Sequence, residues 1–148
     1  MALKKEVLED LQVFLPKKAF LVDEQVSNRT AGGLHTEEAI QAEIIVRPES
    51  TEEVSKILSV CNQAGQPVIV HGGLTGLVYG TRTSSDQLIL SLERMNAIEE
   101  IDPIGRTITC QSGVKLQSIQ EKAESENMIF PLDLGARGSC SIGGNIST

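Results

Sequence analysis

The sequence of 148 residues has few aromatic side chains: no tryptophan, one tyrosine and three phenylalanines. A buried core must therefore be built mainly from Ile, Val and Leu. No run approaches the roughly 18 apolar residues of a membrane span, so none is predicted. The first residues include acids and lack a long apolar stretch, which predicts neither a secretory leader nor a transit segment. These absences predict a soluble, cytoplasmic protein.

Basic residues are also in deficit, since 13 Lys and Arg against 20 Asp and Glu give a net charge of −7. Nucleic acid is not expected as a partner, because binding it requires a basic surface. A phosphorylated small ligand stays open, since surface charges are screened over about 8–10 Å whereas backbone donors act at contact. Cys61, Cys110 and Cys140 form no metal-ligand spacing, and their odd number fits a reducing compartment.

The pattern of apolar residues predicts a helix at the start of the chain. Val7 and Leu11 lie on the apolar face of a helix that ends at the first proline. Residues 19–40 are polar and predict a loop that approaches the main domain. We therefore divide the chain into an N-terminal helix and approach segment, 1–40, and a domain over residues 41–148.

A strand, a helix and a second strand follow. Residues 43–46 predict a short strand, Ser50 an N-cap with acids in the first turn after it, and Gly65 the C-terminal stop of the helix. Residues 68–70 predict the second strand. This βαβ unit predicts a right-handed crossover. It places the residues after Val70 at the carboxyl end of a strand, where α/β sheets bind ligands.

Three further strands are predicted at residues 88–90, 98–101 and 107–110, with a Pro- and Gly-containing turn between the last two. That turn predicts a hairpin. An apolar stripe from Leu116 then predicts a last helix that ends near Asn127. The combination of a βαβ unit and a hairpin predicts an α+β fold rather than a doubly wound sheet.

The most informative pattern is the segment His71-Gly72-Gly73-Leu74-Thr75-Gly76-Leu77, directly after a strand. Three glycines in five positions predict a turn whose backbone approaches a ligand closely. Successive N–H groups in such a turn can receive phosphate oxygens. A second glycine-rich stretch, GARGSCSIGGN, covers residues 135–145. Two such turns suggest one elongated, doubly phosphorylated ligand, for which a dinucleotide is the natural candidate.

Five segments in unbroken order carry a resemblance to a known family. They are VRPESTEEVSKIL, QPVIVHGGLTGLVYG, LILSLERMNAIEEIDP, TCQSGVKLQSIQEKAE and FPLDLGARGSCSIGGNIST. Residues 41–148 thereby resemble the start of the flavin domain of the vanillyl-alcohol-oxidase/p-cresol-methylhydroxylase (PCMH) family of FAD-linked oxidoreductases. The pairing of LSLERMN with GSCSIGGN is most similar to the 2-hydroxyacid branch, which includes D-2-hydroxyglutarate, D-lactate and glycolate dehydrogenases.

The resemblance implies the first subdomain of a PCMH-type FAD-binding domain, a βαβ unit plus short antiparallel strands, with the second subdomain truncated. It implies that the FAD pyrophosphate is wrapped by Gly72, Gly73, Leu74, Thr75, Gly76 and Leu77. It implies that the ribityl and isoalloxazine side is lined by Pro131, Gly138, Ser139, Cys140, Gly143, Gly144 and Asn145. No histidine stands inside the glycine loop, where some relatives attach flavin covalently, so non-covalent FAD is expected.

Three residues depart from the family pattern. Leu74 stands where relatives usually carry Asn or a small residue, Tyr79 replaces a common glycine, and Arg137 occupies an often acidic or small position. The catalytic histidines, metal ligands and substrate-binding arginines of the branch are expected beyond Thr148. No catalytic or metal-binding residue is therefore assigned within this chain, and the fragment alone is expected to be inactive.

The resemblance implies that the full-length protein is a dehydrogenase or oxidase that oxidises a small D-2-hydroxy acid, like 2-hydroxyglutarate or lactate, by hydride transfer to flavin. The alternative is a module that binds a nucleotide or phosphometabolite without redox chemistry. His71 is expected to be a turn residue rather than a base, because no carboxylate partner can be assigned from sequence. Cys140 is expected to be a small buried filler rather than a redox group.

Overall fold

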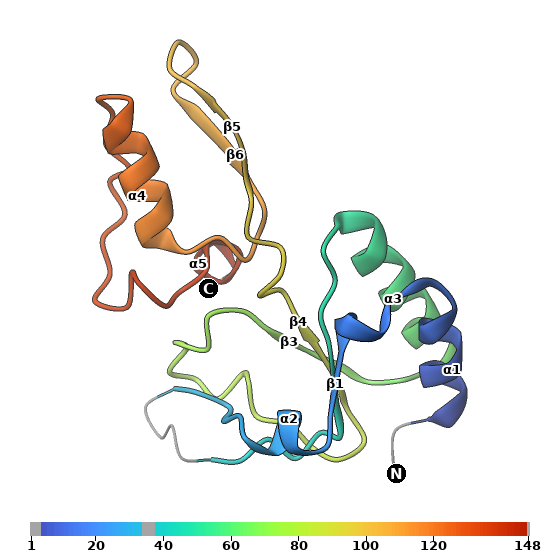
Figure 1. Ribbon diagram of the computed structural model, residues 1–148. Helices are drawn as coiled ribbons and strands as arrows, with labels where there is room; N and C mark the ends of the chain where they lie inside the picture. The colour runs from blue at the N-terminus through green and yellow to red at the C-terminus, as the bar shows by residue number, and fades with distance from the viewer. Residues whose placement is uncertain (1–3, 34–37, 148) are drawn as a thin grey trace.

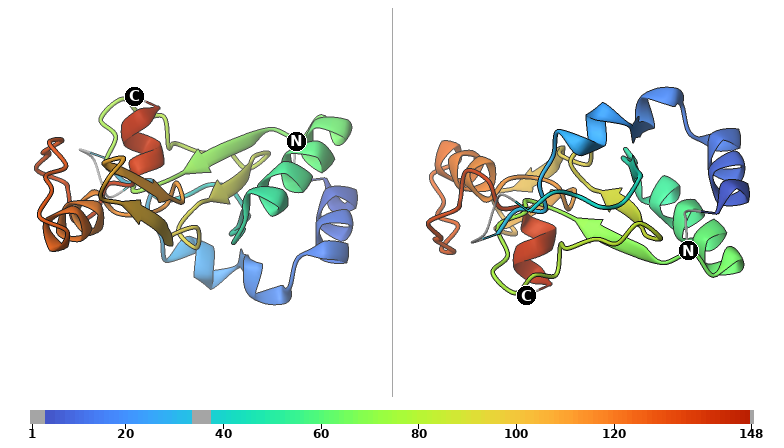
Figure 2. Two further views of the ribbon diagram at one scale, coloured as in Figure 1. Left: turned by 90° about the horizontal axis from the view of Figure 1, so that it is seen from above. Right: turned by 90° about the horizontal axis from the view of Figure 1, so that it is seen from below.

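The computed structural model describes residues 4–33 and 38–147 as two lobes that follow each other along the chain (Figure 1). The first lobe ends near residue 92 and holds a four-stranded sheet of order β1-β2-β4-β3. The second lobe begins near residue 97 and holds a two-stranded sheet, β5-β6. Figure 2 shows α1 and α3 at one end of the molecule and α4 at the other. This mixed architecture confirms the predicted α+β fold.

The bounds of the elements are as follows. The first lobe contains α1 (Lys5–Phe14), the 3-10 turn η1 (Lys17–Ala19), β1 (Phe20–Val22), α2 (Glu24–Ser27), β2 (Ile44–Val46), α3 (Thr51–Ala64), β3 (Val68–His71) and β4 (Leu88–Ser91). The second lobe contains β5 (Ile98–Asp102), β6 (Thr107–Cys110), α4 (Leu116–Ser125) and α5 (Ile142–Ile146).

The predicted strand–helix–strand unit is present as β2, α3 and β3. The Ser50 hydroxyl accepts a hydrogen bond from the Glu53 N–H at 3.2 Å, and Gly65 ends the helix with φ of 61°. Both caps were predicted. However, β2 and β3 are not neighbours, because β4 lies between them and pairs in parallel with each, so that Ile89 faces both Ile45 and Ile69. β4 therefore fixes where β3 ends.

Helices and strands bury both faces of the central strands. Ile44 and Val46 of β2 join the core under α1 and α3, whereas the intervening Ile45 joins a second core on the opposite face. In β4, Leu88 and Ile89 alternate in the same way. Alternating side chains of a strand point to opposite faces of the sheet. Because both faces are covered, these strands are continuous apolar runs, as in buried parallel sheets.

The loop predicted over residues 19–40 is wrong in part. Its first half holds the end of η1, then β1 and α2, and Leu21 pairs antiparallel with Ile45 of β2. A strand of three residues has almost no periodicity to read, so this strand is specified by its neighbour. His71 was predicted to be a turn residue, but it is the last residue of β3 and pairs with Ser91. The glycine-rich stretch near residue 143 also contains a short helix, α5.

The second lobe confirms the predicted hairpin and the helix that begins at Leu116, although this helix is not the last, since α5 follows it. β5 and β6 pair antiparallel with an irregularity between Ile98 and Glu100, and α4 ends at Ser125. Val114, Ile119 and Ile142 form the buried centre of this lobe. The lobe is attached to the first at Gly113, where a side chain would lie 2.7 Å from the Met95 carbonyl oxygen and closer still to that of Leu92. The two lobes are therefore in close backbone contact at their joint.

Candidate glycine-loop cofactor site

The first glycine-rich loop leaves the carboxyl end of β3 and presents free backbone donors. Within the described part of the chain, the N–H groups of residues 73–77 donate no hydrogen bond. A Cβ atom added at Gly76 would meet nothing within 4 Å. A row of unpaired N–H groups beside open space is the arrangement that receives phosphate oxygens. The loop therefore fits an anionic ligand.

The two glycine-rich stretches converge. A Cβ atom at Gly73 would lie 2.6 Å from Cys140 Cα and 2.9 Å from Ser141 N, and closer still to the Ser139 carbonyl oxygen. A Cβ atom at Gly72 would lie 2.7 Å from Ser141 Oγ. Such distances are too short for real Cβ contacts. Glycine is thus required at position 73 by the packing of one stretch against the other, whereas Gly76 leaves space open.

A third segment, which the sequence did not indicate, supports the loop from its other side. The Gly33 N–H donates to the Leu74 carbonyl oxygen at 3.0 Å. A Cβ atom at Gly32 would lie 2.6 Å from Leu74 Cβ, and one at Gly33 would lie 2.9 Å from the Gly76 carbonyl oxygen. Both glycines have positive φ, 73° and 90°. The adjacent pair of glycines was the available signal, but its contact partner is about 40 residues away in sequence.

At two of the three departures from the family pattern, the backbone conformation favours the residue type of the family over the one found here. Leu74 and Tyr79 have φ of 56° and 61°, in the left-handed region. That region costs most residues about 1–2 kcal/mol, and Gly or Asn adopts it more readily. The resemblance expects Asn or a small residue in place of Leu74, and glycine in place of Tyr79. The Tyr79 ring also stacks on the Arg82 guanidinium at 3.9 Å, which helps to fix the far end of the loop.

The second stretch uses most of its own donors. The N–H groups of Ser139 and Cys140 both donate to Ala136 O at 2.8 Å, and the Gly143 N–H donates to Ser112 O at 2.8 Å. It therefore offers close packing rather than a row of free donors. Cys140 is 2% exposed, which confirms that it is buried.

Asn145 carries the one polar side-chain atom of this stretch that is buried without a partner among the described residues, its Oδ1 oxygen. Buried polar atoms without a partner are uncommon in native proteins. An N–H or O–H donor from a bound molecule would satisfy it. This acceptor fits the hydroxyl and ring N–H donors of a flavin.

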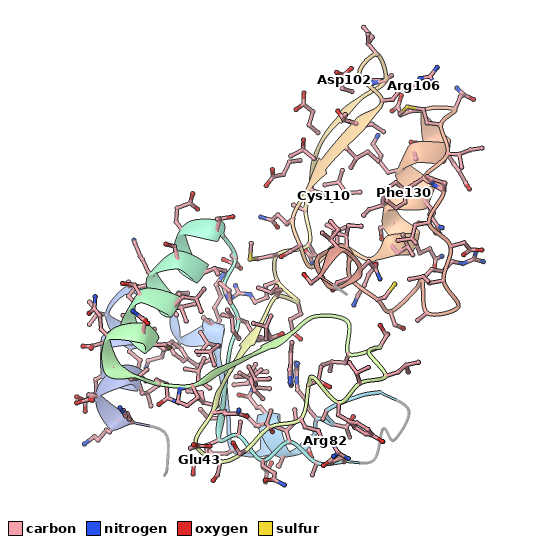
Figure 3. All side chains as sticks on the ribbon, turned by 180° about the vertical axis from the view of Figure 1, so that it is seen from behind. Glu43, Arg82, Asp102, Arg106, Cys110 and Phe130 are labelled. Atoms are coloured by element: carbon pink, nitrogen blue, oxygen red, sulfur yellow. The ribbon has the colours of Figure 1, made fainter. Side chains whose placement is uncertain are left out.

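A large hollow of the described surface lies away from the first loop. It is a groove of about 1170 Å³ between the β5–β6 hairpin, α4 and α5, and of the predicted site residues it is lined by Gly143 and Asn145. Figure 3 shows Cys110 and Phe130, which line it from the hairpin and from the segment after α4. Pro131 lines a separate hollow of about 240 Å³. The structure thus brings residues 72–73 against residues 139–141.

The described residues contain no cluster of three or more His, Cys, Asp and Glu side chains able to hold a metal ion. None of the helices described is long and apolar enough to cross a bilayer.

A mixed sheet with a donor-rich glycine loop at the end of a parallel strand defines a class of ligand-binding domain. A family model described as "FAD binding domain" matches residues 42–148, which is more than half of the chain. The chain therefore belongs to this FAD-binding domain family. The predicted family and its cofactor, FAD, are confirmed by this membership.

The chain is 39% identical over 143 residues to the Danio rerio protein "D-2-hydroxyglutarate dehydrogenase, mitochondrial", covering 95% of this chain and 27% of the relative. The chain thus spans about a quarter of that relative's length. This similarity agrees with the predicted 2-hydroxyacid branch.

Two solved structures share the fold. An alkyldihydroxyacetonephosphate synthase superposes with a TM-score of 0.87 at 19% identity, over 99% of this chain and 30% of that one. A p-cresol methylhydroxylase with substrate bound superposes with a TM-score of 0.70 at 20% identity, over 93% and 28%. The predicted PCMH-type fold is thereby confirmed.

Proposed function

We propose that the protein to which this chain belongs is an FAD-dependent dehydrogenase that oxidises a small D-2-hydroxy acid, and that this chain holds FAD non-covalently. The row of free N–H groups at residues 73–77, on a chain of the FAD-binding family, carries the proposal. The similarity to a D-2-hydroxyglutarate dehydrogenase supports the substrate class. FAD supplies the hydride acceptor in such a reaction.

The residues proposed to hold FAD are the thirteen predicted from the sequence. Those of the first loop are Gly72, Gly73, Leu74, Thr75, Gly76 and Leu77. Those of the second group are Pro131, Gly138, Ser139, Cys140, Gly143, Gly144 and Asn145. The first group donates backbone N–H groups to the diphosphate, and the Thr75 hydroxyl adds a donor. In the second group, small side chains permit close approach and Asn145 Oδ1 accepts a hydrogen bond.

This chain's own contribution is to bind and orient. The contact of Gly73 with residues 139–141 sets the spacing between the donor row and the second stretch. Because this contact is between backbones, it holds that spacing without flexible side chains. A precise separation matters, since catalysis depends on placing reacting atoms in a near-attack geometry.

The first experiment is a titration of the purified protein with FAD, followed by flavin fluorescence and thermal unfolding. FAD at a hundredfold excess over Kd should stabilise the fold by about 2.7 kcal/mol. Riboflavin lacks the diphosphate, and should bind at least tenfold more weakly if the donor row binds phosphate. Equal affinities for FAD and riboflavin would refute the assignment of residues 72–77.

The second experiment tests the substrate class. D-2-hydroxyglutarate and D-lactate should bleach the flavin absorption of the holoprotein, and the L-enantiomers should not. Reduction only by unrelated alcohols would refute the substrate class while leaving FAD binding intact. If the protein binds other nucleotides but is never reduced, the non-redox alternative applies, although membership of the FAD-binding family argues against it.

The cytoplasmic location expected from the sequence remains a prediction. The Danio rerio relative is named as mitochondrial. Fractionation of cells that produce the tagged full-length protein would decide between the two compartments.

A further inference from the structure

His71 lies at the foot of the first glycine loop and has a buried, specific contact. Its side chain is at the end of β3, and the residue is 3% exposed. Its Nε2 atom lies 2.9 Å from the Thr81 carbonyl oxygen. Since a carbonyl oxygen only accepts, Nε2 carries the proton and donates. The ring therefore joins the residue before the loop to the residue after it.

The backbone of His71 is fixed independently of this contact. Its carbonyl oxygen accepts from the Leu92 N–H at 3.0 Å, and it pairs with Ser91 in the parallel register of β3 and β4. The ring thus projects from the rigid sheet, whereas Thr81 belongs to the connection between the strands. A hydrogen bond from the ring to Thr81 holds the end of residues 72–80 against the sheet.

The other attachments of the loop act on both of its halves. Gly33 supports Leu74, and residues 139–141 support Gly73, so both contacts act on the first half of the loop. At the second half, Arg82 bonds to Tyr79 and pairs with Glu38 at the surface. Just beyond it, the Thr83 hydroxyl oxygen accepts from the Gln41 N–H at 2.9 Å and from the Ala42 N–H at 3.3 Å. The His71–Thr81 bond is the link that runs from this second half directly to the end of β3. Holding a loop in its binding conformation raises affinity, because less freedom is lost on binding.

We propose that His71 is a positioning residue, whose ring N–H to the Thr81 carbonyl holds the glycine loop closed and thereby sets the affinity for the cofactor. The effect on cofactor affinity rests on the proposed function, whereas the closure of the loop does not. His71 itself contacts no ligand in this assignment. Its effect is exerted through the shape of residues 72–80.

The test compares His71→Gln with His71→Asn. The side-chain amide nitrogen of Gln takes roughly the place of Nε2, whereas that of Asn is too short and takes the place of Nδ1. A matched control is Ile57→Val, in α3 away from the loop, which removes one buried methylene group and so lowers overall stability without touching the loop. This control separates a loss of overall stability from a loss of loop closure.

Loop closure is measured without any cofactor, as the rate at which trypsin cuts after Arg82. We expect His71→Asn to be cut about tenfold faster than the wild type, in keeping with the loss of one buried hydrogen bond. His71→Gln should stay within about threefold of the wild type, and Ile57→Val should be cut at the wild-type rate. A His71→Asn variant that melts earlier but is cut no faster would overturn the proposal.

Cofactor affinity is measured by FAD titration of the same variants. His71→Asn should raise the FAD Kd about tenfold, with His71→Gln and Ile57→Val close to the wild type. Faster cutting with an unchanged Kd would overturn the link to affinity. If the wild type binds no FAD, the proposed function fails, yet the trypsin result still decides whether His71 closes the loop.

Discussion

The two lobes bury their strands to different degrees. In the first lobe, every residue of β2 and β4 is buried, with α1 and α3 over one face of the sheet. In the second lobe, no residue of β5 or β6 is fully buried, and an open groove runs between the hairpin and α4. An isolated two-stranded hairpin is marginally stable in water. The first lobe therefore has a complete hydrophobic core of its own, whereas the stability of the second lobe depends on contacts beyond its own two strands.

The candidate site contains residues from both lobes. Its donor row belongs to the well-packed first lobe, whereas residues 139–141 belong to the open second lobe. Their contact at Gly73 is where the two lobes meet near the proposed cofactor. The free N–H groups that we propose as phosphate donors therefore belong to the well-packed lobe, and the second lobe must be held in place for the proposed site to be complete.

The largest expected effect is the loss of unfolding free energy when a core residue is truncated, which we compare between the two lobes. Ile89→Ala, at a fully buried position of β4, should cost about 3–5 kcal/mol in free energy of unfolding, since large-to-small changes in a rigid core leave a cavity. Ile119→Ala, beside the groove, should cost about 2–3 kcal/mol because its surroundings can relax or admit water. Urea unfolding measures both. Equal costs would break the comparison between the lobes.

The junction between the lobes is tested by Gly73→Ala. Its new methyl group would overlap the backbone at Cys140 and Ser141, so the stretches must separate, at a cost of about 1–3 kcal/mol. FAD affinity should fall at least tenfold. The matched control is Gly76→Ala in the same loop, whose methyl group meets nothing within 4 Å. That control should change stability by less than about 0.5 kcal/mol.

The next prediction concerns an ion-pair network at the end of the first lobe. Glu93 accepts from Arg29 at 2.7 Å and from Arg47 at 3.0 Å. Burial opposes ionisation of Glu93, but the hydrogen bonds and charges of the two arginines outweigh it and lower the pKa of the carboxyl below 4.5. Glu93→Gln should cost about 1–3 kcal/mol at neutral pH.

The sign of the pH dependence follows from the lowered pKa of Glu93. Its stabilisation is fully present above the unfolded pKa near 4.5, and is lost as pH falls through the lower folded pKa. The difference in unfolding free energy between the wild type and Glu93→Gln should therefore shrink on acidification from about pH 5. A difference that stays constant down to pH 2 would contradict this assignment.

The smallest expected effect concerns backbone strain within the loop. Leu74→Asn should stabilise the protein by up to about 1 kcal/mol, because Asn tolerates the positive φ of this position better than Leu. Leu77→Asn, at a position 61% exposed in the same loop, is the control and should give no such gain. Thermal unfolding measures both changes. A loss of stability in Leu74→Asn would show that the Leu74 side chain contributes packing that outweighs its strain.

Local signals in the sequence were sufficient for most elements. The Ser50 cap and the Gly65 stop marked α3, and the turn after Ile101 marked the hairpin, because caps and turns depend on a few adjacent residues. Other features had no local signal. The short strand β1 exists through its pairing with β2, and the role of Gly32 depends on Leu74, which is distant in sequence.

The candidate site divides in the same way. The sequence by itself determined the family, the glycine loop after a strand and the second glycine-rich stretch, because each is a contiguous pattern. Only the tertiary structure decided that Gly73 packs on residues 139–141, that β4 separates β2 from β3, and that the His71 ring reaches Thr81. The physical reason is that such contacts are set by the packing of whole elements, which no single segment encodes.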